Sequence, residues 1–171
     1  MTVNTSPPAR RTGWSLLLHN RLAALGLLLL IVTITAALLA PLLPLPDPDA
    51  TDLLKRLAPP LTPGHLLGTD ALGRDMLSRL LWGTRVSVAV GLSATLLAAV
   101  CGTLIGLIAG YAAGRTDNIL MRLIDMIMAF PYILLALAIV AVLGPGLLNA
   151  LYAIALVNIP FVARNVRGLT L

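Results

Sequence analysis

The sequence VSVAVGLSATLLAAVCGTLIGLIAGYAAG, residues 86–114, contains 29 consecutive residues without a charge and is bounded by Arg85 and Arg115. A helix of roughly 20 apolar residues spans the hydrocarbon core of a bilayer. The stretch therefore predicts a membrane-spanning helix that is long enough to tilt or to emerge at one end.

Two other stretches predict further spans. Residues 22–40 carry no charge, and the 38 uncharged residues 126–163 are long enough to cross a bilayer twice. The triplet Gly144-Pro145-Gly146 divides the second stretch, because glycine and proline disfavour a continuous helix. The expected spans are residues 21–41, about 86–112, about 119–143 and about 147–163.

The bulk composition supports a membrane protein. Hydrophobic residues make up 58% of the 171 positions and charged residues 11%, and the mean hydropathy is +0.96. A soluble domain carries about 25% charged residues, and a chain of this length could not bury so much apolar surface. The sequence therefore predicts an all-α integral membrane fold of about four transmembrane helices, together with an external amphipathic helix described below.

The basic residues are explained by the orientation of the chain in the membrane rather than by binding to nucleic acid. The net charge is +5, but no basic run exceeds two residues, so membrane topology explains the basic residues better than nucleic acid does. The Lys/Arg bias places both ends inside, with residues 1–20 as a cytoplasmic tail. A cleaved signal peptide is the alternative for residues 21–41, but its apolar core would be about 7–15 residues, and Pro41 is a poor cleavage context.

Residues 42–84 form the only long polar segment and are expected to be an external loop. Its early prolines impose an extended path. Either Thr69 or Asp70 is able to cap a helix, and the apolar positions that follow predict an amphipathic helix over about residues 70–82, lying at the outer interface.

Span two carries a small residue at every fourth position, a spacing that lets helix backbones approach closely. The structural interpretation is a helix-packing seam, and the functional alternative is a surface that slides during gating. The seam residues are Ala94, Ala98, Gly102, Gly106, Gly110 and Gly114.

Polar residues within the spans are candidates for anchoring or for the transport path. Arg122 and Asp125 lie three apart on one helix face, which predicts a local salt bridge at the helix end, with a role in the pathway as the alternative. Pro131 predicts a kink. Asn158 is expected to hydrogen-bond to a neighbouring helix.

No arrangement of residues predicts catalysis. His65, Asp70 and Asp75 do not have the spacing of a metal site, and no nucleophile–base pair or phosphate-binding loop occurs. We therefore expect no enzymatic activity, no metal and no bound cofactor.

One external pattern is more specific than the rest. It reads HLLGTDALGRDMLSR over residues 65–79, and its polar residues and glycines are His65, Gly68, Thr69, Asp70, Gly73, Arg74, Asp75, Ser78 and Arg79. This pattern resembles the signature of dipeptide/oligopeptide/nickel-type permease subunits of ATP-binding-cassette importers, in particular the second permease of the pair. The resemblance continues through residues 83–87, 106–114 and 163–168, and through Arg122, Asp125 and Pro131.

The resemblance implies a type I importer permease fold in the cytoplasmic (inner) membrane of a bacterium or archaeon. It also implies a second, homologous permease subunit as a heterodimer partner, two ATPase subunits that use ATP and Mg, and an external solute-binding protein. The cargo remains open among dipeptides, oligopeptides, nickel and glutathione. The functional alternatives are an ATP-independent channel or secondary transporter, or a non-coupling fragment.

Members of this family continue into a cytoplasmic loop with a Glu-Ala-Ala-type motif, which docks on the ATPase. This sequence contains no Glu. Residues 85–171 are therefore expected to be the start of the permease transmembrane domain without the coupling loop, in a C-terminally truncated chain.

Overall fold

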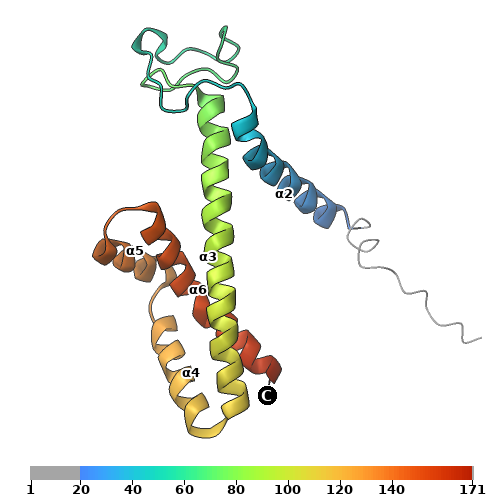
Figure 1. Cartoon of the computed structure of the whole chain (residues 1–171), viewed down its shortest axis with the longest axis vertical. Helices are drawn as coiled ribbons and strands as arrows, with labels where there is room; N and C mark the ends of the chain where they lie inside the picture. The colour runs from blue at the N-terminus through green and yellow to red at the C-terminus, as the bar shows by residue number, and fades with distance from the viewer. Residues whose placement is uncertain (1–19, 171) are drawn as a thin grey trace, which may run out of the picture. The chain divides into compact units, whose positions relative to one another are not determined.

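The computed structural model describes residues 20–170, so the expected tail lies outside the described residues except for Asn20. The chain divides into two compact units at the boundary between Val86 and Ser87. The described residues form helices and no β-strand (Figure 1). In chain order the helices are α2 (Arg21–Leu39), η1 (Ala40–Leu42), η2 (Leu53–Lys55), α3 (Met76–Ala112), α4 (Gly114–Met128), α5 (Tyr132–Leu143) and α6 (Leu147–Thr170).

Helix α2 lies within the expected first span and has the surface of a helix that faces lipid. The Asn20 side chain caps its start by accepting hydrogen bonds from the backbone N–H groups of Leu22 and Ala23. The four consecutive side chains Leu28–Ile31 are all more than half exposed. Because successive residues of a helix point about 100° apart, these four cover its whole circumference with apolar surface.

The external helix expected over residues 70–82 is wrong in both extent and kind. Residues 70–75 form turns, and α3 begins at Met76 and runs without interruption to Ala112. The cap is provided by Asp75, whose Oδ2 accepts a hydrogen bond from the backbone N–H of Ser78 at 2.7 Å. The amphipathic segment is therefore the first part of a membrane-length helix.

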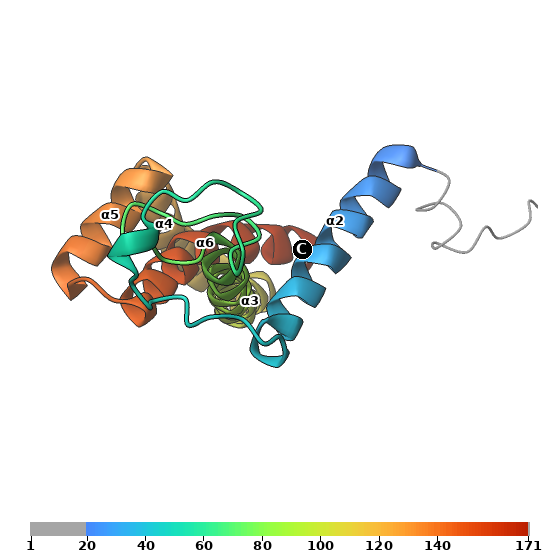
Figure 2. The ribbon, with the colours of Figure 1, turned by 90° about the horizontal axis from the view of Figure 1, so that it is seen from above.

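The single helix expected over residues 119–143 is also wrong, because it is two helices. Helix α4 ends at Met128, α5 begins at Tyr132, and their axes differ by 90°. Pro131 at the break lacks a backbone N–H and disfavours helical conformation in the residue before it. In the view of Figure 2, α3 is seen nearly end-on, whereas α5 lies nearly in the plane of the picture.

The ends of the last helices also differ from expectation. The segment between the expected spans 86–112 and 119–143 is already helical from Gly114, because the chain reverses at Ala113 and Gly114, whose φ angles are 47° and 59°. Helix α6 extends to Thr170, seven residues beyond the expected end at 163. Both α4 and α5 pack against α6 (Figure 1).

Three of the four seam glycines mediate a close contact between α3 and α6. A Cβ atom added at Gly102, Gly106 or Gly110 would lie within 2.6 Å of Val162, within 2.6 Å of the Ala163 carbonyl oxygen, or within 1.8 Å of the Thr170 hydroxyl, respectively. Gly114 is the exception, because it has no neighbour within 4 Å of such a Cβ and instead occupies the positive-φ turn.

The order of the contacts between α3 and α6 indicates how many times the chain crosses a bilayer. The partners on α6 advance in the same direction as the glycines on α3, so the two helices run parallel. A chain that leaves α3 on one side of a bilayer must cross back before it enters α6. Helices α4 and α5, with 15 and 12 residues, are about 22 and 18 Å long, each too short for a core of about 30 Å. Together they form one broken span, which gives four spans within residues 20–170.

Candidate functional site

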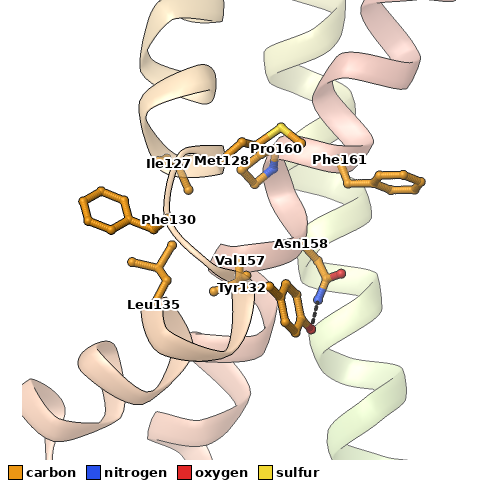
Figure 3. Close-up of a pocket in the computed structure, with 9 residues that line it drawn as sticks. All are labelled: Ile127, Met128, Phe130, Tyr132, Leu135, Val157, Asn158, Pro160 and Phe161. Carbon is orange, nitrogen blue, oxygen red and sulfur yellow. Dashed lines mark hydrogen bonds between the residues drawn. The ribbon is translucent and has the colours of Figure 1, made fainter.

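The break between α4 and α5 opens a pocket against α6 (Figure 3). Its volume is about 460 Å³, within the range of small-molecule sites. Helix α4 and the break provide one wall, the start of α5 another, and residues 157–161 of α6 the third. The lining residues are Ile127, Met128, Phe130, Tyr132, Leu135, Val157, Asn158, Pro160 and Phe161.

Two polar side chains meet in this otherwise apolar lining. Asn158 Nδ2 on α6 donates hydrogen bonds to Tyr132 Oη on α5 at 3.3 Å and to the Ile154 carbonyl oxygen at 2.7 Å (Figure 3). The first of these links two helices, as expected for Asn158. The sequence singled out Pro131 and Asn158 but missed Tyr132, because nothing in its local pattern indicates that α5 folds back toward α6.

The salt bridge expected between Arg122 and Asp125 is wrong. Asp125 pairs with Arg164 of α6, and Arg122 is exposed, with no carboxylate in ion-pair distance among residues 20–170. The pairing follows from the packing of α4 on α6, which brings Asp125 to a partner 39 residues away in sequence.

A second pair between the same helices was missed by sequence reasoning. Asp117 in the first turn of α4 accepts two hydrogen bonds from Arg167 of α6, at 2.5 Å from Nε and 2.6 Å from Nη2. The Asp117 side chain is 11% exposed. Such fork-like pairing fixes orientation as well as distance, so the two pairs hold the start and the later turns of α4 against the end of α6.

The external pattern forms a network around Asp70. The carboxylate accepts hydrogen bonds from the backbone N–H groups of Leu72 and Arg74, at 2.8 and 3.0 Å, and from the side chains of Arg74 and Arg79. Burial acts to raise the pKa of Asp70, but the hydrogen bonds from Arg74 and Leu72 outweigh it and hold the pKa well below its ordinary value of 3.8.

The remaining pattern residues fasten the loop to the start of α3. His65 Nδ1 lies 3.0 Å from Asp75 Oδ1, and the Thr69 hydroxyl bridges the two sides of the loop by donating to the Lys55 carbonyl and accepting from the Ala58 N–H. Asp70 and Asp75 are therefore engaged by different partners.

Three further pattern residues make close contacts with the backbone of the loop. The Ser78 hydroxyl donates to the Pro46 carbonyl. Gly73 has a φ of 76° and faces the Asp52 carbonyl so closely that a Cβ would lie 1.8 Å from the oxygen. Gly68 faces the Ala58 carbonyl in the same way, at 2.3 Å. These contacts indicate a structural role for the pattern, in which it holds the loop in one conformation at the start of α3.

Two models of known protein families match parts of this chain. Residues 102–171 match the model of the family described as binding-protein-dependent transport system inner membrane component. Residues 9–60 match the N-terminal transmembrane domain of oligopeptide transport permease C. The first match includes α4, α5, α6 and the pocket between them, and the second includes α2.

Individual relatives are transport-system permease proteins. The chain is 42% identical over 167 residues to a di/tripeptide transport system permease protein of Pseudomonas aeruginosa, covering 95% of this chain and 55% of the relative. It is 45% identical over 158 residues to a dipeptide transport system permease protein of Alkalihalophilus pseudofirmus, covering 92% and 52%. A glutathione transport system permease protein of Pectobacterium atrosepticum is 51% identical over 107 residues, covering 63% and 36%. The chain thus spans about half the length of the first two relatives.

Proposed function

We propose that this chain acts as a membrane-spanning permease subunit of an ATP-binding-cassette importer, which moves short peptides or similar small solutes across the cytoplasmic membrane. The observation that carries the proposal is the match of residues 102–171 to the inner membrane component family. The broken span supports it, because discontinuous helices commonly line solute sites in transporters. Relatives named for di/tripeptide and glutathione transport favour small peptides as cargo.

In this proposal the chain contributes a wall of the pathway and no chemistry of its own. A second, homologous permease subunit would complete the pathway, two ATPase subunits would use ATP and Mg, and an external solute-binding protein would deliver the cargo. The N-terminus would be cytoplasmic. Arg115, Arg164 and Arg167 lie where α3 and α6 end, and the bias of basic residues toward the inner side supports this orientation.

Uptake measurements test the proposal. Deleting the gene in its host should abolish uptake of labelled dipeptides, and restoring it should recover uptake. Depleting ATP should block transport, whereas collapsing the proton gradient at constant ATP should leave it intact. Unchanged uptake of dipeptides, tripeptides and glutathione after deletion would contradict the proposal. Uptake driven by an ion gradient without ATP would instead support a secondary transporter, which the comparisons do not favour.

A further inference from the structure

The pocket at the α4–α5 break has an unusual lining. Both phenylalanines of the chain, Phe130 and Phe161, border it, and no charged side chain of residues 20–170 does. Their side chains point away from each other on opposite sides of the pocket, and each is more than 60% exposed (Figure 3). The pocket thus offers aromatic and aliphatic surface at its rim, and its polar groups are Tyr132 and Asn158.

The hydrogen bonds of this polar pair leave two positions open. The amide NH₂ of Asn158 has two hydrogens, which are donated to Tyr132 Oη and to the Ile154 carbonyl. Within residues 20–170, Asn158 Oδ1 accepts no hydrogen bond and the Tyr132 hydroxyl donates none. This acceptor and this donor therefore belong to two residues that are hydrogen-bonded to each other in an apolar surrounding.

This combination is complementary to a peptide group, which presents one N–H donor and one C=O acceptor. An apolar lining of this kind disfavours a charged side chain, because no counter-charge would compensate its desolvation. Building on the proposed transport function, we propose that the pocket is a solute-contact site, in which Tyr132 and Asn158 hydrogen-bond a peptide group of the cargo and the lining accommodates uncharged side chains.

Kinetics of the intact importer provide the first test. Tyr132→Phe removes the hydroxyl and keeps the ring, and Tyr152→Phe makes the same change at an exposed position of α6 outside the pocket. With saturating loaded binding protein, Tyr132→Phe should lower the maximum uptake rate of Leu-Leu by roughly fivefold, the size expected for one hydrogen bond. Tyr152→Phe should leave the rate unchanged. Equal rates for the two variants would overturn the proposal.

The relative uptake of two different dipeptides provides a second test. A purely structural role of Asn158 would not change this ratio. Asn158→Asp introduces a negative charge into the pocket and keeps the size of the side chain. It should raise the uptake of Lys-Lys relative to Leu-Leu at least several-fold. A ratio equal to that of the wild type, in an importer that still assembles, would overturn the assignment.

Thiol labelling tests occupancy directly. In a Cys101→Ala background, which removes the only cysteine of the sequence, Phe161→Cys should react with a maleimide, and Leu-Leu should slow the reaction during turnover. Tyr152→Cys in the same background should show no such protection. Labelling that is blocked in the assembled importer before solute is added would show that a neighbouring helix fills the pocket and would overturn the proposal. A wild-type importer that transports no peptide would instead contradict the proposed function itself.

Discussion

Arg167, near the end of α6, donates two hydrogen bonds, of 2.5 and 2.6 Å, to Asp117 in the first turn of α4. The two residues are 50 positions apart in sequence. A planar guanidinium matches both oxygens of a carboxylate, so the contact sets the rotation of α4 about its own axis as well as its distance from α6.

Replacing one partner of this pair should loosen the bundle of α4 and α6. Arg167→Lys cannot form both hydrogen bonds, and it should lower the apparent melting temperature in detergent by roughly 3–6 °C. Arg122→Lys is the matched control, because Arg122 is exposed and has no carboxylate partner among the described residues. Equal melting temperatures for the two variants would show that the pair does not stabilise the fold.

The close packing of α3 on α6 predicts that alanine substitutions at two glycines of α3 have different effects on stability. At Gly106 a Cβ would lie 2.6 Å from the Ala163 carbonyl oxygen and 2.8 Å from Val166 Cβ, whereas at Gly91 it would meet nothing within 4 Å. Gly106→Ala should therefore cost about 1–3 kcal/mol through overpacking. Gly91→Ala should be neutral or stabilise by about 0.5–1 kcal/mol. Thermal unfolding of both variants measures the difference, and a destabilising Gly91→Ala would contradict the assigned packing.

The start of α3 depends on Asp75, which both caps the helix and contacts His65. Asp75→Ala removes the cap and should destabilise the protein by about 1–2 kcal/mol. Asp75→Asn keeps a side-chain oxygen for the Ser78 N–H and should retain most of that stability. Hydrogen exchange of the first turns of α3 checks this prediction. Exchange should be slowest in the wild type, faster in Asp75→Asn and fastest in Asp75→Ala. If Asn exchanges as fast as Ala, the charge and not the cap is the stabilising element.

Lowering the pH should destabilise the outer loop, because it protonates the carboxylate of Asp70. The folded-state pKa of Asp70 lies well below 3.8, its ordinary value, so the carboxylate contributes stability that is fully present above about pH 4. This contribution is lost as the pH falls from there toward the folded-state pKa. The difference in melting temperature between the wild type and Asp70→Asn should accordingly be constant from pH 7 to pH 4 and shrink in stronger acid. Asp49→Asn, at an exposed loop position, is the control and should show a small difference. A wild-type advantage that grows with acidity would refute this account.

The first two membrane spans could be predicted from sequence because each depends on local composition. An uncharged stretch of the length of residues 22–40 or 86–114 has few alternatives to a spanning helix. The close packing of Gly102, Gly106 and Gly110 follows from their spacing in the same way. Gly114 continues the spacing but lies in a turn, because the positive φ required there selects glycine for a different reason.

The site could not be predicted because it depends on contacts that are distant in sequence. The spacing of Arg122 and Asp125 permits a local salt bridge, but α6 offers Asp125 a different partner, Arg164. Pro131 indicates a bend without indicating its size, and the 90° turn is what brings Tyr132 to Asn158. Similarly, an apolar face after Asp70 is typical of an interfacial helix, whereas the capping by Asp75 makes it part of α3.

The broken third span has a consequence for the order in which the protein enters the membrane. Helix α4 carries two arginines and two aspartates in 15 residues, so it is a poor substrate for insertion by itself. Both aspartates find their partners on α6, which is synthesised later. We therefore expect stable integration of α4 to wait until α6 has emerged from the ribosome, so that α4, α5 and α6 enter the bilayer as one cooperative unit.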